Sequence, residues 1–252
     1  MSPMFEEIKN KRVLITGASS GIGACTAELF ASYGATVGIH YNTNEKDAKE
    51  LEREISNRFS SPVLIKADLL NIDETKRVVQ TFIDKTGGID ILINNAGSII
   101  GTPHFLKMND ESWDKTLNLN LKAPFFLAKS AFSYMMTSGG GRIISISSIA
   151  AKYGGSTSSI HYGAAKAGIE AVTRTLAREG AQYNILVNAI EPGVIETKFH
   201  RKIGRSSLEG RVKSIPLKRA GKPLDVARLC VFLASDAGDY ITGQVYGVTG
   251  GD

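Results

Sequence analysis

The sequence predicts an α/β fold: a doubly wound parallel sheet of about seven strands with helices on both faces. Two observations predict it. Short, almost wholly apolar segments alternate with longer segments of helical periodicity along the whole chain. The short segments are also too uniformly apolar for a sheet with one wet face, which indicates strands buried on both sides.

Each expected strand is a short apolar run that ends at a turn or a polar residue. The strands are expected at 12–16, 35–41, 62–66, 89–93, 142–146, 185–190 and 244–248. Amphipathic stretches between them predict helices at 22–33, 45–58, 73–85, 113–136, 160–183 and 224–234. Pro124 lies inside the fourth helix and is expected to bend it.

Composition is that of an ordinary globular protein, with 42% apolar and 22% charged residues among 252. Neither a repeat nor a linker divides the chain, so one domain covering 1–252 is expected. The polar stretch 1–11 has no signal-peptide core, and no apolar run is long enough to cross a bilayer. These features predict a cytoplasmic protein without membrane attachment.

Cysteine and histidine usage argues against disulfides and metal sites. Cys25 and Cys230 are far apart in sequence, lie in apolar helical patterns and are expected to be packed core thiols. The four histidines show no ligand spacing, so we expect no metal.

Positive charge is concentrated near the C-terminus. The chain carries a net charge of +5, whereas 198–222 holds nine Lys/Arg against Glu209 alone and carries +8. This irregular segment is the expected lid. It is either a solvated flap or a basic collar for an anionic partner. Nucleic acid is not expected, because no nucleic-acid-binding motif accompanies the charge.

A glycine-rich turn, TGASSGIG at 16–23, follows the first strand and opens the first helix. Glycines let backbone N–H groups approach a pyrophosphate, and a helix N-terminus adds partial positive charge. The position of the turn predicts a Rossmann-type dinucleotide site.

The end of the second strand bears on the choice of cofactor. A carboxylate there would hold the ribose of NAD and repel a 2′-phosphate. Between the end of the strand at Tyr41 and Glu45 the sequence has no acid. Its absence favours NADP, although NAD stays open because no arginine stands there either. The candidate hydrogen-bond donors to a phosphate are Ser19, Ser20, Asn42 and Thr43, with Lys46 as a reachable cation.

Tyr162 and Lys166 stand four apart in an expected helix and therefore share a face. An ammonium beside a phenol favours the phenolate, so we expect Lys166 to lower the pKa of Tyr162. Tyr162 would then donate and accept protons near neutral pH. A tyrosine and a lysine four apart on a helix are more often ordinary surface residues, and the functional interpretation depends on the rest of the sequence.

Together these motifs resemble the short-chain dehydrogenases/reductases over nearly the whole chain, with most similarity to the 3-oxoacyl-acyl-carrier-protein reductases. The NNAG segment at 94–97 follows the fourth strand, and ITGQ at 241–244 resembles the family's C-terminal strand. The resemblance implies four catalytic residues, Asn120, Ser148, Tyr162 and Lys166. Asn118 and Ser147 are the neighbouring alternatives to Asn120 and Ser148.

The resemblance also implies the cofactor contacts. They are Gly17, Ser19, Ser20, Gly21, Ile22, Gly23, Tyr41, Asn42, Thr43, Asp68, Leu69, Asn95, Ala96, Gly97, Tyr162, Lys166, Pro192, Gly193, Ile195 and Thr197. Asn94 is expected to tie neighbouring backbone together.

The implied reaction is hydride transfer between a nicotinamide and a carbonyl/alcohol pair. Ser148 would hydrogen-bond the substrate oxygen and Tyr162 would give it a proton. Lys166 would bind the nicotinamide ribose, and Asn120 would hold a water that links Lys166 to solvent.

The substrate is less constrained. The basic segment suits an acidic acyl carrier protein or a phosphate-bearing thioester, and a generalist ketone, sugar or steroid reductase is the alternative. A dinucleotide-sensing protein without catalysis would not need the four implied residues.

Glu191, before Pro192, either points outward or meets a cationic substrate group. The helices expected at 113–136 and 160–183 carry aromatic and small residues at helical spacing, which often pack against partner chains. Because the family that the sequence resembles is commonly tetrameric, we expect a homotetramer.

Overall fold

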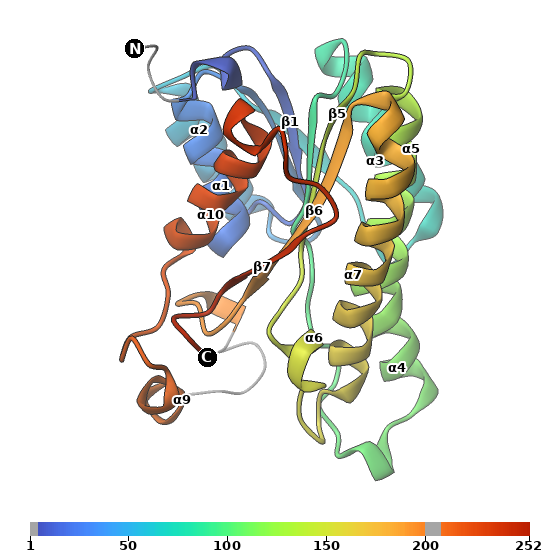
Figure 1. Cartoon of the computed structure of the whole chain (residues 1–252), viewed down its shortest axis with the longest axis vertical. Coiled ribbons are helices and arrows are strands. Elements are labelled where there is room, and N and C mark those ends of the chain that lie inside the picture. Colours follow the sequence, from blue (N-terminus) through green and yellow to red (C-terminus); the bar gives the residue numbers. More distant parts are fainter. Residues whose placement is uncertain (1–4, 200–207) are drawn as a thin grey trace.

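The computed structural model describes residues 5–199 and 208–252. Its centre is a seven-stranded sheet in the order β3-β2-β1-β4-β5-β6-β7, and all six neighbouring pairs are parallel. Helices cover both faces of this sheet (Figure 1). The predicted fold class is therefore confirmed.

The strands are buried on both sides, as their apolar sequences predict. Val13 and Ile15 of β1 point into one core, whereas Leu14 between them points into the other. The strands are β1 (Arg12–Ile15), β2 (Thr36–Tyr41), β3 (Val63–Lys66), β4 (Ile91–Asn94), β5 (Gly141–Ile146), β6 (Ile185–Pro192) and β7 (Val245–Val248).

Two groups of helices enclose the sheet (Figure 1). One core packs against α1 (Gly21–Ser32), α2 (Glu45–Ser56) and α10 (Pro223–Ala234). The other packs against α3 (Ile72–Thr86), α5 (Ala123–Met135) and α7 (Ile160–Gly180). The chain leaves β1 toward β2 and β3 and returns to β4 on the other side. This reversal opens a crevice at the carboxyl ends of β1 and β4, where such folds bind ligands.

The helix expected at 113–136 is three elements. They are α4 (Asp110–Leu117), a π-helical turn η3 (Asn118–Lys122) and α5. The expectation that Pro124 bends one continuous helix is wrong, because Pro124 lies in the first turn of α5, where its missing N–H costs little. The irregularity lies before it, at the π turn.

Short elements join the main ones. The turn at Ala181–Tyr183 lies within the helix expected at 160–183, and the others were not predicted. Helix α6 (Ala150–Tyr153) follows β5, and α9 (Glu209–Ser214) lies within the basic segment. The 3₁₀ turns are η1 (Glu6–Ile8), η2 (Phe105–Lys107), η4 (Ala181–Tyr183) and η5 (Asp236–Gly238).

The basic segment predicted as a lid is described only at 198–199 and 208–222, so the rest of that prediction lies outside the described residues. Three of its cations pair with acids from outside the segment. The pairs are Lys198–Asp47 at 2.6 Å, Arg211–Asp252 at 3.3 Å and Arg219–Asp225 at 2.9 Å.

Both cysteines are free thiols on packed helices. Cys230 on α10 is buried, and burial raises its pKa to about 12. Cys25 on α1 is only half-buried, so the core-thiol prediction is confirmed in full for Cys230 alone. Within 5–199 and 208–252, no three His, Cys, Asp or Glu side chains are grouped as metal ligands. No helix in these two ranges has the length and apolar character needed to span a membrane.

Candidate active site

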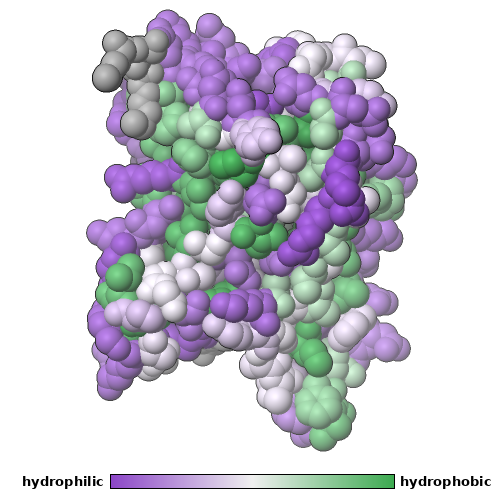
Figure 2. All heavy atoms as spheres, in the orientation of Figure 1, coloured by the Kyte–Doolittle hydropathy of each residue, from purple (hydrophilic) through white to green (hydrophobic). Residues whose placement is uncertain are grey.

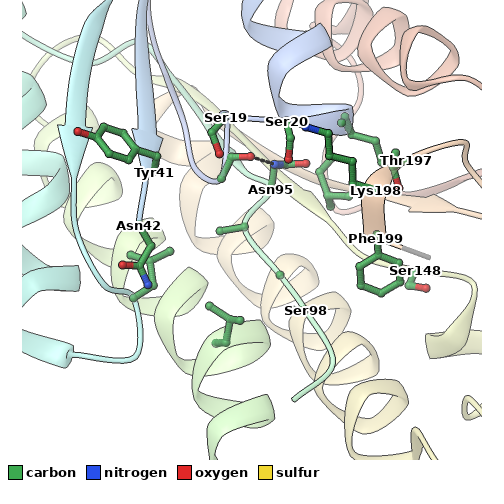
Figure 3. A pocket seen from close by; sticks show the side chains of 18 of the residues that line it. Ser19, Ser20, Tyr41, Asn42, Asn95, Ser98, Ser148, Thr197, Lys198 and Phe199 are labelled. Carbon is green, nitrogen blue, oxygen red and sulfur yellow. Dashed lines mark hydrogen bonds between the residues drawn. The ribbon is translucent and has the colours of Figure 1, made fainter. Parts of the chain in front are cut away.

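A cavity of about 390 Å³ lies at the carboxyl ends of the central strands (Figure 3). It collects nearly all of the predicted cofactor contacts. The predicted residues that line it are Gly17, Ser19, Ser20, Gly21, Ile22, Tyr41, Asn42, Thr43, Asp68, Leu69, Asn95, Ala96, Gly97, Ser148, Tyr162, Lys166, Pro192, Gly193, Ile195 and Thr197. Gly23 and Asn120 are the two predicted residues that stand just behind its wall.

The glycine-rich turn is built as a cradle for an anion. Gly17 and Gly21 adopt φ values of +62° and +60°, which disfavour side chains. A Cβ atom on Gly17 would also lie 2.9 Å from the Ala96 Cα. Within the described chain, Ser20 makes no side-chain cap at the start of α1, so N–H groups of its first turn remain available to a phosphate.

Thr16 and Asn95 lock the ends of β1 and β4 together below the cavity. The Thr16 hydroxyl oxygen accepts from the backbone N–H groups of Asn95 and Ala96, both at 3.0 Å. The Asn95 amide donates to the carbonyl oxygens of Thr16 at 2.8 Å and Gly17 at 3.1 Å. The Asn94 amide donates to the Pro124 carbonyl at 3.0 Å, as expected for a residue that ties backbone together.

His40 was not predicted as part of the site. Its Nδ1 accepts from the Gly17 N–H at 3.1 Å, and its Nε2 lies 3.1 Å from the Ala67 carbonyl oxygen. Burial lowers its pKa to about 4, which keeps the ring neutral. A neutral ring that accepts at Nδ1 carries its proton on Nε2, so His40 ties the glycine-rich turn to β2 and to the end of β3.

Asp68 stands beside the β2 end. Its Oδ1 accepts from the Asn42 amide at 3.1 Å and from the Leu70 N–H at 3.0 Å. The loop after β2 therefore meets the loop after β3 at the rim of the cavity.

Tyr162 and Lys166 share a face of α7, as predicted, and both line the cavity. The expected effect on the tyrosine is wrong for this structure. Protein packed around Tyr162 raises its pKa to about 12, and a hydrogen bond with Ser148 lowers it by less. Lys166 instead donates to the Ile146 carbonyl at 2.7 Å, and burial lowers the Lys166 pKa to about 8. Its ammonium lies 5.6 Å from the Tyr162 ring centre.

The two neighbouring serines have different surroundings. The Ser147 hydroxyl is buried and donates to Glu170 Oε1 at 2.7 Å. The Ser148 side chain hydrogen-bonds Tyr162, and its Oγ accepts from the Ala150 N–H at 3.2 Å. The turn that opens α6 thus presents Ser148, rather than Ser147, to the tyrosine.

Asn120 lies in the π turn with its side chain buried. Its amide donates to the carbonyl oxygens of Ser98 at 2.7 Å and Thr116 at 2.8 Å, and its Oδ1 has no hydrogen-bond partner among the described residues. A Cβ atom on Gly97 would lie 2.7 Å from Asn120 Oδ1 and 3.2 Å from Lys166 Nζ. An orphaned acceptor therefore stands near the Lys166 ammonium, where a water would satisfy it.

Asn118 and Glu191, whose roles the sequence leaves open, lie near these groups but outside the cavity lining. Asn118 is half-buried and is not among the lining residues of the described cavity. Glu191 does not line it either. Burial and the nearby Glu170 raise the pKa of Glu191, and Lys152 opposes them, so this carboxylate of β6 interacts with charged groups of α7 and α6.

Comparisons with known proteins agree with this geometry. The family model described as enoyl-(acyl carrier protein) reductase matches residues 17–252. The 3-oxoacyl-[acyl-carrier-protein] reductase FabG of Thermotoga maritima is 40% identical over 97% of this chain and 98% of its own. The corresponding reductase of Synechocystis is 37% identical over 94% and 95%.

Solved structures agree as well. A candidate NAD(P)-dependent gluconate 5-dehydrogenase from Beutenbergia cavernae, with bound NADP, has a TM-score of 0.90, 33% identity and 96% coverage of both chains. A blue fluorescent protein from a metagenomic library, in complex with NADPH, has a TM-score of 0.90 and 31% identity over 97% and 98% of the two chains.

A phosphate cradle at the switch point of a doubly wound sheet, with a tyrosine, a lysine and a serine beside it, defines a nicotinamide-dependent oxidoreductase. Such enzymes act on a carbonyl/alcohol pair when a hydroxyl faces the reacting oxygen. The chain belongs to the short-chain dehydrogenase/reductase family.

Proposed function

We propose that this enzyme reduces the keto group of a 3-oxoacyl thioester with NADPH. The observation that carries the proposal is the meeting of the Ser148 and Tyr162 hydroxyls in the cavity that also holds the phosphate cradle. Two hydroxyls side by side suit one oxygen that gains negative charge, as a ketone oxygen does. The cofactor is NADP, and two solved neighbours hold this nucleotide.

The residues fit the cofactor. The glycine-rich turn and the α1 N-terminus would hold its pyrophosphate, and Lys166 would hold the ribose next to the nicotinamide. Bound NADPH supplies the hydride. Ser148 orients the substrate oxygen, and Tyr162, which carries its proton at pH 7, gives that proton to the oxygen. Asn120 Oδ1 holds the water through which the proton is replaced.

Removing one hydroxyl tests the proton donor. In Tyr162→Phe the ring stays but the donor is lost, so we expect kcat to fall by roughly 10²–10⁴. Fluorescence titration should show NADPH binding within about twofold of the wild type. Turnover within a factor of three of the wild type would reject Tyr162 as the donor.

Features at the cavity mouth support an acyl substrate on an acidic carrier. The lower edge of the molecule is hollowed between the projection with α9 and the projection with α4 and η2 (Figures 1 and 2). Apolar side chains are exposed on these segments, among them Leu106 at 78% and Leu217 at 63%. Lys213 of α9 and Lys222 at the start of α10 add exposed positive charge in this part of the chain. Apolar contacts suit the acyl chain, and the lysines suit an acidic carrier.

Charge reversal separates the carrier from the thioester. In Lys213→Glu/Lys222→Glu we expect the KM for an acyl-carrier substrate to rise about tenfold, with little change for the same acyl group on a small thiol. Lys9→Glu, which reverses an exposed charge at the far end of the molecule, is the matched control. Reduction of neutral ketones at rates that ignore both the reversal and added salt would favour a generalist reductase instead.

We also propose that the chain acts as one domain in a cytoplasmic homotetramer assembled through α5 and α7. Phe125 and Phe126 remain only half-buried on α5, and Ala164, Ala167 and Ala171 expose a smooth face on α7. Phe132 of the same helix belongs to the core and does not support assembly. Sedimentation velocity should give the mass of four chains, and Phe126→Glu should shift it to smaller species. A wild-type monomer at micromolar concentration would refute the assembly.

A further inference from the structure

The junction between β2 and α2 is where a doubly wound fold meets the adenosine ribose of its dinucleotide. Here Asn42, Thr43 and Asn44 line the cavity and bring no positive charge. A 2′-phosphate carries nearly two negative charges. Two acids in the first turn of α2, Glu45 and Asp47, would repel it. The junction alone therefore disfavours the phosphate that distinguishes NADP from NAD.

Lysines compensate both acids. Glu45 pairs with Lys49 at 2.7 Å and with Lys66 at 3.5 Å. Asp47 Oδ2 accepts from Lys198 Nζ at 2.6 Å and from the Asn44 amide at 2.9 Å. The hydrogen bond from Lys198, followed by that from Asn44, holds the pKa of Asp47 below its usual value. The carboxylate thus stays ionised and keeps the ammonium in place.

Lys198 differs from the other lysines in its origin, because it comes from the segment after β6, on the other side of the cavity. It also lines the cavity itself. Figure 3 shows its side chain extending from beside Thr197 toward Ser20 of the glycine-rich turn. Its ammonium shares one oxygen of Asp47 with Asn44, so the positive charge stands at the β2–α2 junction.

We propose that Lys198 is the residue that makes the enzyme select NADP over NAD. In the free enzyme Asp47 holds its ammonium, and on binding the ammonium turns to the 2′-phosphate. The exchange costs little, because the Lys198 side chain is 67% exposed and exposed ion pairs contribute little stability. A phosphate offers greater charge and three strong acceptors.

Lys46, the cation suggested by the sequence, is the competing candidate. It stands in the first turn of α2 and is exposed, but it is not among the residues that line the described cavity. Lys46 and Lys198 both lie near Asp47 but come from different segments of the chain. Removal of either charge therefore gives a matched pair of variants.

Equilibrium binding tests the proposal without turnover. Dissociation constants for NADPH and NADH are measured by fluorescence titration at fixed salt for the wild type, Lys198→Met and Lys46→Met. We expect Lys198→Met to weaken NADPH binding about tenfold and NADH binding less than twofold. Lys46→Met should leave the ratio of the two constants within about twofold of the wild type. Adenosine 2′,5′-bisphosphate and 5′-AMP, as competitors, should repeat the pattern.

The other outcomes overturn the proposal. Equal weakening of NADPH and NADH in Lys198→Met would assign the lysine to the pyrophosphate or to cleft closure. Loss of selectivity in Lys46→Met alone would assign the 2′-phosphate to that residue. Asp47→Asn gives a second check, because removal of a repelling carboxylate should tighten NADPH two- to fivefold and leave NADH unchanged. Weakening of NADPH in Asp47→Asn as large as in Lys198→Met would mean that the ion pair itself, and not the free ammonium, matters.

Discussion

Burial moves the pKa values of the two central ionisable residues in opposite directions. The pKa of Tyr162 is raised to about 12 and the pKa of Lys166 is lowered to about 8. Both shifts arise because the charged form of each side chain loses its hydration in the cavity wall. The tyrosine is therefore held as a neutral proton donor, while the lysine carries a charge that costs stability. Residues kept for function at the expense of stability are a common feature of active sites.

Lys166→Met should stabilise the cofactor-free enzyme at pH 7. Moving the lysine pKa from 10.5 to about 8 corresponds to a cost of about 3 kcal/mol, and the lost hydrogen bond to Ile146 offsets about 1 kcal/mol of the gain. We expect the free energy of unfolding to rise by about 1–3 kcal/mol in urea denaturation, with turnover abolished.

The pH dependence checks the cause of this gain. Below pH 8 the lysine is charged in both the folded and the unfolded state, so its full cost is present. Between pH 8 and 10.5 the folded state releases the proton first, the unfolded state binds more protons, and wild-type stability rises with pH. The advantage of Lys166→Met should shrink over this window. A constant advantage from pH 7 to 10.5 would contradict burial of a charged amine as its source.

Most candidate site residues could be named from the sequence because its motifs resemble those of a known family in order and spacing, but their contacts could not. His40 carries no signal in the sequence, since one polar residue in a buried strand does not reveal that the next loop supplies its donor. The choice between Ser147 and Ser148 likewise depends on Glu170, which lies on α7, far from both serines in the sequence. Desolvation of Tyr162 depends on packing from several elements, so its pKa direction could not be taken from Lys166 alone.

At the scale of elements, the segment after β4 must pass between the cavity and the π turn. Gly97 makes this possible, because any Cβ atom there would press on Asn120 Oδ1 and approach Lys166 Nζ. Helix periodicity predicts a continuous helix through Asn120 and gives no sign of the π turn. The turn directs the Asn120 side chain inward, and π turns of this kind often occur at functional sites.

Gly97→Ala should therefore reduce activity through a contact with two side chains that we propose are catalytic. The added methyl group displaces Asn120 or Lys166, so we expect kcat to fall by roughly 10-fold or more, because small misplacements at a reacting centre are costly. The free energy of unfolding should fall by about 1–3 kcal/mol, as for other overpacked sites.

Gly210→Ala is the matched control for the same chemical change. Gly210 lies in α9, and no described atom stands within 4 Å of the position of an added Cβ. This variant should keep wild-type activity, with stability unchanged or higher by up to about 1 kcal/mol. Equal kinetics for the two alanine variants would show that the space above Gly97 is not needed.

At the scale of the whole molecule, the cofactor cavity joins the two halves of the sheet. Its lining comes from the segments after β1, β2 and β3 on one side and from those after β4, β5 and β6 on the other. Direct contacts between the halves at this end include the bonds of Thr16 with Asn95 below the cavity and the Lys198–Asp47 ion pair across it. A dinucleotide that contacts both halves adds binding energy that only the folded chain can use.

NADP should therefore raise the melting temperature, and by more than NAD at equal concentration. A ligand at 100 times its Kd stabilises the folded state by about 2.7 kcal/mol. For a chain of this size each kcal/mol is worth roughly 2–4 °C, so we expect a rise of about 5–10 °C in differential scanning calorimetry at fixed protein concentration. The rise should scale with the logarithm of the free NADP concentration, since NADP binds only the folded state. NADP that binds in fluorescence titration yet leaves the melting temperature unchanged would show that it does not bind the folded chain in preference to the unfolded one.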